Sequence, residues 1–435
     1  MCKKSIFTRL QSSVSRRVYA MVVISGLCSL NAVGQGLGNT PYSTYGIGET
    51  YSGAVAAQQM MGGTGVSYAN GLFINGLNPA LIARNRITTL EVGTLIQTKQ
   101  LREGNLSQQV VGGTLNYLAM AFPLNSRWTI SANYAPHSYL DYQSQTTGQI
   151  PGDIYPYVTE YKGSGGTNRV SLVNGVRVYK NLYAGVSASF LFGNLTREAS
   201  TRTVKDGTND YTLLLTDNDQ HRDFLLKGGL AYRFKLNDKR YLNVGGTYDL
   251  PARLRTTRVR TLGTLIGDIP VVNGTDTLSF NSQGRITVPG GYKVGVTFEN
   301  PYKLAVSVDF GMEQWSQFRD FDRSNQNLKD SYHIKAGLEY TPSWNSSSFW
   351  NRIPYRFGLS YGQLPYTIAG QRITEASISA GLGLPLTKVG LSDANLGVTV
   401  GQRGRDAIGV IKEQFFRFNL GFTISDRWFY RQVVD

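Results

Sequence analysis

The chain has 435 residues, of which 41% are hydrophobic and only 17% charged, and its formal net charge at pH 7 is +15. Glycine (49 residues) and tyrosine (26) are abundant, a composition that suits strands and turns better than helices. The low charge argues against an ordinary soluble protein of this size. After residue 30, no apolar run approaches the length of about 18 residues that a membrane-spanning helix needs.

The first 34 residues have the organisation of an export signal. A basic stretch precedes an apolar run over residues 18–30, and the small residues Ala32 and Gly34 flank a cleavage site before Gln35. The alternative is an uncleaved anchor. Both cysteines lie in this segment, so the mature chain would have no disulfide. Removing the five basic residues of the signal would lower the net charge to +10. The five are Lys3, Lys4, Arg9, Arg16 and Arg17.

From residue 86 onward, apolar and small or polar residues alternate with the period of two that is typical of strands. In the stretch LYAGVSASFLFG, residues 182–193, every even position is apolar, and KLAVSVDFGME at 303–313 has the same alternation. These runs extend over nine to eleven residues or more, the length that crosses a bilayer at a tilt of about 45°. Tyrosine and tryptophan often stand near the ends, as in the aromatic girdles of outer-membrane barrels.

The sequence therefore predicts an all-β fold, a fourteen-stranded antiparallel transmembrane barrel over residues 86–424, followed by a periplasmic tail over 425–435. A secreted β-sandwich or jelly roll is the alternative. The predicted strands are 86–97, 112–122, 127–135, 168–179, 182–195, 222–234, 240–250, 286–298, 303–316, 330–341, 353–362, 371–384, 393–402 and 414–424. Long outer connections are expected at 98–111, 136–167, 196–221, 251–285, 317–329 and 403–413, with short turns at the periplasmic end.

Residues 35–85 do not alternate, and we expect them to form a plug inside the barrel rather than a disordered leader. A short helix is predicted around Ala54–Met61, ended by two glycines. Apolar residues follow that a disordered leader would seldom carry. They are also the candidate ligand-binding residues: Leu72, Phe73, Ile74 and Leu77.

Two groups of motifs resemble the FadL/TodX-type outer-membrane transporters of hydrophobic compounds. The first is GGTGVSYANGLFINGLNPALIARN, ending just before the first predicted strand; the second comprises VPGGYKVGV, WSQF at 315–318 and LKDSYHIKAGLEY at 328–340. The resemblance covers nearly all of the mature chain. It implies passive uptake of fatty-acid-like or aromatic compounds through a plugged barrel that has a lateral opening. It places Asn78, Pro79, Ala80 and Leu81 in the hatch, where proline would fix a bend; a simple turn is the alternative.

Few residues suggest chemistry. The three histidines, His137, His221 and His333, lack the spacing of a metal site or catalytic triad, so we expect no enzyme activity, metal or cofactor. Asp309, Glu313, His333 and Lys335 fall on one side of adjacent predicted strands, as a charge network in the lumen would require.

A basic cluster stands at the predicted start of an outer loop: Arg253, Arg255, Arg258 and Arg260. These arginines could bind the phosphates of lipopolysaccharide or a ligand carboxylate through bidentate contacts, or they could be a solvated loop edge. The modest basic excess of an exported protein favours lipid headgroups over nucleic acid as the partner.

The prediction is thus a monomeric outer-membrane barrel that passes hydrophobic small molecules without energy input. The alternative is a FadL-like barrel that is a partner or scaffold of an outer-membrane secretion machinery and transports no ligand. A general porin fits less well, because the plug would block the flow of water.

Overall fold

The computed structural model describes residues 37–152, 155–204, 211–267, 269–387, 391–406 and 409–426. The predicted export signal lies outside the described residues, and so does the tail from residue 427 onward. Within the described ranges, no helix has both the length and the apolar character needed to cross a bilayer.

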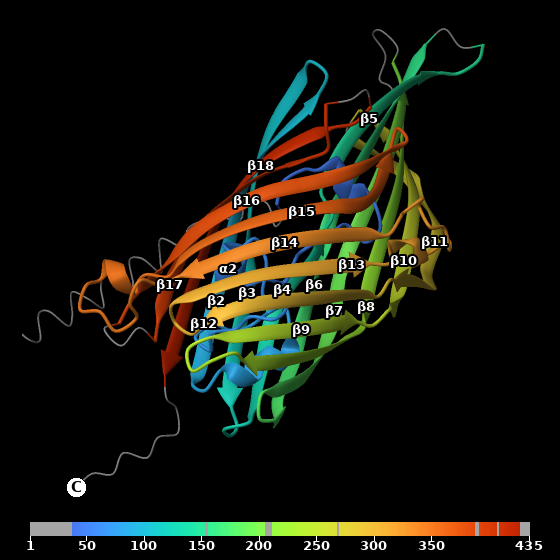
Figure 1. Cartoon of the computed structure of the whole chain (residues 1–435). Helices are drawn as coiled ribbons and strands as arrows, with labels where there is room; N and C mark the ends of the chain where they lie inside the picture. Colours follow the sequence, from blue (N-terminus) through green and yellow to red (C-terminus); the bar gives the residue numbers. More distant parts are fainter. Residues whose placement is uncertain are drawn as a thin grey trace, which may run out of the picture. The chain divides into compact units, whose positions relative to one another are not determined.

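Antiparallel strands from residue 88 onward pair in sequence order around a closed wall (Figure 1). The last strand pairs with the first, from Asp426 opposite Thr88 to Lys412 opposite Arg102. The strands are β2 (Thr88–Glu103), β3 (Leu106–Pro123), β4 (Trp128–Tyr139), β5 (Tyr142–Gln149), β6 (Pro156–Tyr179), β7 (Leu182–Thr203), β8 (Tyr211–Lys235), β9 (Tyr241–Asp249), β10 (Ala252–Ile266), β11 (Ile269–Val288), β12 (Gly291–Asn300), β13 (Leu304–Glu313), β14 (Ser331–Tyr340), β15 (Tyr355–Ile368), β16 (Gln371–Pro385), β17 (Asp393–Arg403) and β18 (Lys412–Asp426).

Three of the wall strands are interrupted by short breaks. β4 continues as β5, and β9 continues as β10 along the same neighbour, β8. β11 continues as β12 after Pro289 and Gly290, where proline cannot donate a ladder hydrogen bond. Counting each interrupted strand once gives the fourteen strands of the wall, which confirms the predicted fold class.

Every predicted strand overlaps a wall strand, but the predicted outer connections are largely wrong. Most of 98–111, 136–167, 196–221, 251–285 and part of 403–413 is strand, and β6, β7 and β8 have 24, 22 and 25 residues. Polar and charged residues stand on both faces of these extensions, so their sequences lack the apolar alternation that marks the membrane-crossing part. The predicted connection over 317–329 does lack strands, apart from an isolated bridge at Arg319.

The two faces of the wall differ as the alternation predicts. On β7, Val186 is 55% exposed and Phe190 40%, whereas Ser189 and Leu191 on the other face are buried. Apolar side chains thus cover the outer face, which in a bilayer meets lipid.

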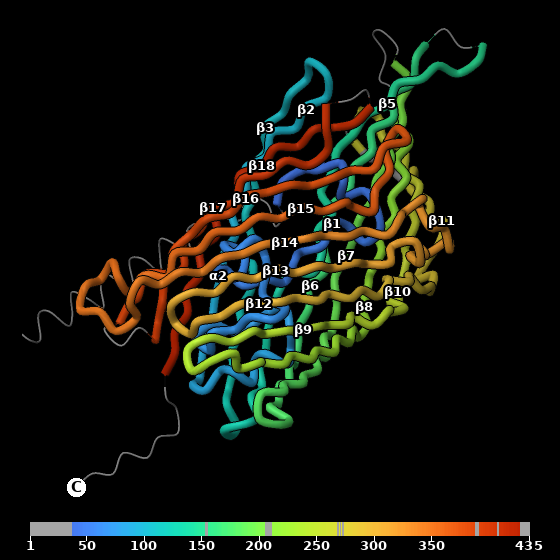
Figure 2. The backbone as a smooth tube through the Cα atoms, in the orientation of Figure 1, coloured from blue at the N-terminus to red at the C-terminus, as the bar shows by residue number. Residues whose placement is uncertain are grey.

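Residues 37–87, which we call the N-terminal segment, lie within the ring of strands (Figure 2). The segment contains the 3-10 helix η1 (Pro41–Thr44), the short strand β1 (Glu49–Thr50), the helix α2 (Ala56–Gln59) and the 3-10 helix η2 (Pro79–Arg84). α2 contacts β16, β17 and β18, whereas η2 contacts β4, β6, β7 and β8. Parts of the wall distant in sequence therefore hold the two halves of the segment. α2 lies within the predicted range of Ala54–Met61.

Two further 3-10 helices lie in the connections: η3 (Trp315–Gln317) and η4 (Trp350–Arg352).

Candidate functional site

The predicted bend is present at Asn78 and Pro79. The Asn78 side chain accepts a hydrogen bond from the Ala80 amide at 3.0 Å and so caps η2, which begins at Pro79. Its amide nitrogen donates to the Val66 carbonyl at 2.7 Å and to the Leu230 carbonyl on β8 at 3.2 Å. One buried side chain therefore fixes the start of η2, an earlier part of the segment and the wall.

Glycines in the wall make room for this bend. A Cβ atom at Gly185 on β7 would lie 2.4 Å from the Ala80 nitrogen, and one at Gly229 on β8 would lie 2.2 Å from Asn78 Oδ1. Real Cβ atoms do not approach so closely, so any side chain at either position would displace η2. Close backbone approach is a recognised reason for glycine inside a strand.

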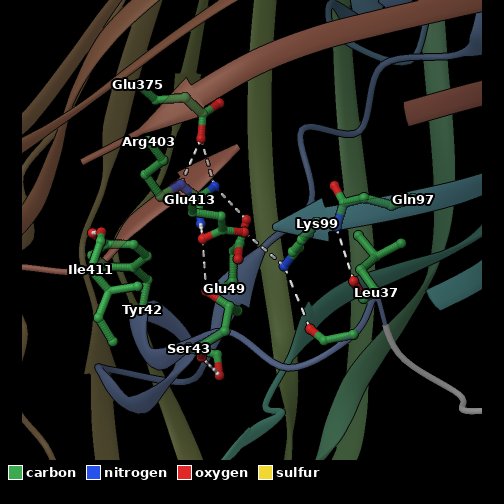
Figure 3. Close-up of polar contacts among 12 residues, drawn as sticks. Leu37, Tyr42, Ser43, Glu49, Gln97, Lys99, Glu375, Arg403, Ile411 and Glu413 are labelled. Atoms are coloured by element: carbon green, nitrogen blue, oxygen red, sulfur yellow. Dashed lines mark hydrogen bonds and ion pairs between the residues drawn. The ribbon is translucent and has the colours of Figure 1, made fainter. Parts of the chain in front are cut away.

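A buried cluster of charges joins residues 40–49 of the N-terminal segment to the wall (Figure 3). Arg403 on β17 contacts Glu49 and Glu375, both at 2.6 Å, and Lys99 on β2 contacts Glu413 at 3.1 Å. Thr40 donates to Glu413 at 3.0 Å. We call Glu49, Lys99, Glu375, Arg403 and Glu413 the latch cluster. Buried charges are tolerated only when they are paired in this way.

The four residues of the predicted charge network line one cavity of about 290 Å³. Asp309 stands opposite Lys335, and His333 stands opposite Gly311 rather than opposite Asp309 or Glu313, as the sequence had suggested. No ion pair joins any two of the four within the described residues. Asp309 instead accepts hydrogen bonds from the amides of Gly65 and Val66, at 2.7 and 2.9 Å.

The other partners of this network also differ from the prediction. Glu313 accepts from the Trp315 indole at 3.0 Å and lies 3.8 Å from the Lys293 ammonium. The four residues therefore lie on one face, but they do not pair with one another. The partners of Asp309 and Glu313 are in the N-terminal segment, the connection that follows β13 and the neighbouring strand.

A second cavity, of about 170 Å³, lies between the N-terminal segment and the wall, and its lining is mixed. Val55, Ile74 and Val173 are among its apolar residues. Arg169 on β6 has no ion pair or side-chain hydrogen bond within the described part of the chain. His137 is half-buried, and neither of its two buried ring nitrogens has a hydrogen bond to the described residues. We call this space the Arg169 cavity.

The predicted ligand-binding residues separate in the structure. Ile74 lines the Arg169 cavity, and Leu77 lines the larger one. Phe73 is buried against Tyr68, with ring centroids 6.2 Å apart, and neither Phe73 nor Leu72 lines these two cavities. Arg169 and the latch cluster were not anticipated from the sequence.

The wall has a break between its second and third strands. β3 pairs with β2 along most of its length but with β4 only through residues 118–123. Farther along β4, Glu49 and Thr50 of β1 take the vacant place opposite Tyr139 and Ser138. On the other edge, Gly38 lies against Val110 and Val111 of β3. The N-terminal segment thus lies along both edges of the break.

The four arginines predicted at the start of an outer loop lie instead on β10, and they divide into two pairs. Arg258 binds Asp219 and Arg260 binds Asp217, each through a 2.6 Å contact from Nε. These two arginines are therefore neutralised by the neighbouring strand, β8. Arg253 and Arg255 are exposed on the opposite face of β10.

Solved structures with the same fold cover nearly the whole wall. They include the CymD monoaromatic hydrocarbon channel, at 15% identity over 87% of this chain and 99% of that one, with a TM-score of 0.58. The toluene transporter TbuX of Ralstonia pickettii has 15% identity over 86% and 98%, with a TM-score of 0.55. A FadL homologue of Pseudomonas aeruginosa has 12% identity over 86% and 99%, with a TM-score of 0.59.

At these identities the likeness establishes the fold, that of the FadL-type outer-membrane channels, as the sequence motifs predicted. No curated protein matches the sequence. The sequence does match a protein family, BamG, over residues 16–435. Since this match spans the wall and the whole N-terminal segment, the chain belongs to the BamG family.

Proposed function

We propose that the protein passes small hydrophobic compounds across the outer membrane without energy input, with the N-terminal segment as a hatch. The Arg169 cavity carries this proposal. Its volume of about 170 Å³ is close to that of an engineered apolar cavity of about 150 Å³ that binds benzene. A compound with a single ring matches that size, whereas a long acyl chain does not.

The chemistry of the lining supports the same class of ligand. Val55, Ile74 and Val173 offer apolar surface, while the charged part of the lining has three cationic side chains, Arg169, Lys227 and Lys293, and two acidic ones, Asp249 and Glu313. The excess of cationic side chains favours a bound anion, and Arg169 forms no direct ion pair within the described residues that would compete with it. Compounds that combine an aromatic ring with a carboxylate therefore suit this cavity, alongside neutral aromatic compounds. Two of the structural relatives are named as a monoaromatic hydrocarbon channel and a toluene transporter.

The break between β3 and β4 supports a lateral route. Movement of residues 37–51 away from the two edges would open the wall beside the lumen. The latch cluster would set how readily this movement occurs, because it joins the same residues to β2, β16, β17 and β18.

The test uses two neighbouring residues of β7 that face opposite ways. Ser187 lines the Arg169 cavity, whereas Val186 is exposed on the outer face. Ser187→Phe should lower uptake of toluene or benzoate into proteoliposomes about tenfold, the equivalent of about 1.4 kcal/mol in binding. Val186→Phe is the matched control. Equal uptake by the two variants would refute passage through this cavity.

A second candidate is a partner or scaffold of an outer-membrane secretion machinery, and one observation favours it. The connection over 341–354, at the end of the barrel where β18 finishes, exposes aromatic residues: Trp350 is 68% and Phe349 40% exposed, with ring centroids 5.7 Å apart. Aromatic residues are enriched in protein interfaces and dominate their binding energy.

The two candidates predict different results for one pair of variants. Replacing Phe349 and Trp350 with alanine should abolish co-purification of stoichiometric protein partners if the chain is a scaffold, with Leu386→Ala on the next connection as the control. The same double variant should leave toluene uptake unchanged if the chain is only a channel.

A further inference from the structure

Four arginines gather on the outer face of β8, β10 and β11, and only two of them were recognised in the sequence. They are Arg222, Arg253, Arg255 and Arg285. In the strand register, Arg255 stands directly opposite Arg222 on one side and Arg285 on the other. All four are exposed, whereas the alternate residues Leu254 and Ile286 are buried toward the interior.

These charges are not balanced by protein groups. Within the described part of the chain, none of the four guanidinium groups has an ion pair or a side-chain hydrogen bond. The nearest acid along β8, Asp223, accepts from the backbone amide of Arg255 at 3.2 Å. Residues directly opposite in a sheet have Cβ atoms about 5 Å apart, and like charges there are destabilising. An anion from outside the chain would therefore stabilise three arginines in one row.

The position along the strands shows which surface the row meets. β8 ends at Lys235, and its outward residues from Phe234 back to Phe224 are apolar and exposed, among them Leu226, Leu230 and Tyr232. A membrane-crossing strand needs about 9–11 residues. Counting that length back from Lys235 ends at about Phe224, and Arg222 is the next outward residue. The arginines thus begin where the apolar band ends, at the outer-leaflet boundary.

The apolar band directly below the arginines is aromatic. Phe224 stands opposite Phe190, with ring centroids 5.2 Å apart, and Phe192 stacks on Phe190 at 6.0 Å. Arg222 stands opposite Phe192. The same patch therefore offers guanidinium groups at the depth of lipid headgroups and ring surface at the depth of acyl chains.

We propose that this arginine row binds the phosphate groups of lipopolysaccharide in the outer leaflet, with the acyl chains lying over the phenylalanine cluster. Guanidinium groups bind phosphate through paired, charge-assisted hydrogen bonds, and a multivalent anion would offset the repulsion along the row. This binding is separate from the lumen and does not depend on the proposed transport.

The experiment compares two variants that lose the same charge. In the first, Arg222, Arg253, Arg255 and Arg285 become glutamine. In the control, four exposed basic residues in turns at the opposite end of the barrel become glutamine: Arg127, Lys239, Arg240 and Lys303. Purified proteins in mild detergent are incubated with lipopolysaccharide, and the bound glycolipid is quantified by mass spectrometry. A shift in gel mobility on heating confirms that each barrel is folded.

The wild type and the control should retain lipopolysaccharide, and the first variant should retain about tenfold less, because its charge-assisted contacts are gone. Arginine-to-lysine replacement at the same four sites should restore part of the binding. Enzymatically dephosphorylated lipopolysaccharide should bind the wild type as weakly as intact glycolipid binds the first variant.

Equal retention by the first variant and the control would overturn the proposal, as would undiminished binding of the dephosphorylated form. Displacement of the glycolipid by inorganic phosphate at equal phosphate concentration would assign the row to free phosphate and also overturn it.

Discussion

Arg403 on β17 and Glu49 on β1 are 354 residues apart in sequence, and their side chains meet at 2.6 Å between Nη2 and Oε1. Both are buried, and Arg403 is shared with Glu375 and Glu413. Paired, these groups tolerate burial; with one partner removed, the others are left as buried charges. This contact therefore determines how firmly residues 37–51 of the N-terminal segment are held against the wall.

Replacing Arg403 with methionine should destabilise the latch cluster by about 3–5 kcal/mol, because three buried carboxylates would lose their shared guanidinium partner. The expected result is faster proteolysis within residues 37–51. The gel mobility of the protein should still change on heating, which shows that the wall is folded. Arg405→Met, at an exposed position two residues on, is the control and should behave as wild type. Equal protection in the two variants would contradict the role given to the cluster.

Adjacent glycines on β8 allow a test of the packing around Asn78. A Cβ atom at Gly229 would meet Asn78 Oδ1 at 2.2 Å and Pro79 Cδ at 2.8 Å, whereas one at Gly228 would meet no atom within 4 Å. Gly229→Ala should therefore cost about 1–3 kcal/mol in urea unfolding, as overpacked cores do. Gly228→Ala should change stability by less than about 0.5 kcal/mol. The prediction is wrong if both variants unfold at the same urea concentration.

The response to acid follows from Glu49. Burial by itself would raise the pKa of Glu49, but the charges of Arg403 and Lys99 lower it more, so its pKa lies below the ordinary value. A carboxyl group with a lowered pKa in the folded state contributes stability above its unfolded pKa of about 4.3, and this is lost as the pH falls further. Protease protection of residues 37–51 should thus be constant between about pH 7.5 and 5.5 and fall only below about pH 4. Loss of protection near pH 6 in the wild type would show that another group controls the segment.

Asp309 supplies a test in the larger cavity. Its carboxylate accepts hydrogen bonds from the amides of Gly65 and Val66. A hydrogen bond to a charged group contributes about 1.5–3 kcal/mol to stability. Asp309→Ala should speed hydrogen exchange at these two amides and lower the unfolding free energy by about that amount. Asp238→Ala, in an exposed turn, is the control. Unchanged exchange at Gly65 and Val66 would mean that their protection comes from the surrounding backbone alone.

The membrane-crossing wall could be predicted because lipid on one side and the lumen on the other impose a contrast on alternate residues. Above the membrane that contrast disappears, which is why the sequence pattern predicts loops for the outer halves of β6, β7 and β8. The charge pattern of Arg258 and Arg260 was visible in the sequence. Their partners, Asp217 and Asp219, depend on the register of β8 against β10, which the sequence does not contain.

The interior could be predicted only where a feature depends on neighbouring residues in the sequence. The bend at Asn78 and Pro79 is a local property of those residues, so its position was correct. The latch cluster depends on Glu375, Arg403 and Glu413 standing in one cross-strand row and on Glu49 arriving from the N-terminal segment. Inward-facing glycines, such as Gly185 and Gly229, were a usable signal that a second backbone lies close, although they do not identify it.

The most direct test of the proposed hatch fixes the N-terminal segment to β3. Gly38 has a φ of +81°, which makes a side chain there strained, but its ideal Cβ atom lies 3.4 Å from Val110 Cβ, near the separation of about 3.5–4.5 Å found in disulfides. Both native cysteines precede Gln35, so the double variant Gly38→Cys and Val110→Cys should form one cross-link after the predicted processing. Toluene uptake into proteoliposomes should stop on oxidation and return on reduction. Uptake that continues unchanged through the fully cross-linked protein would contradict the account.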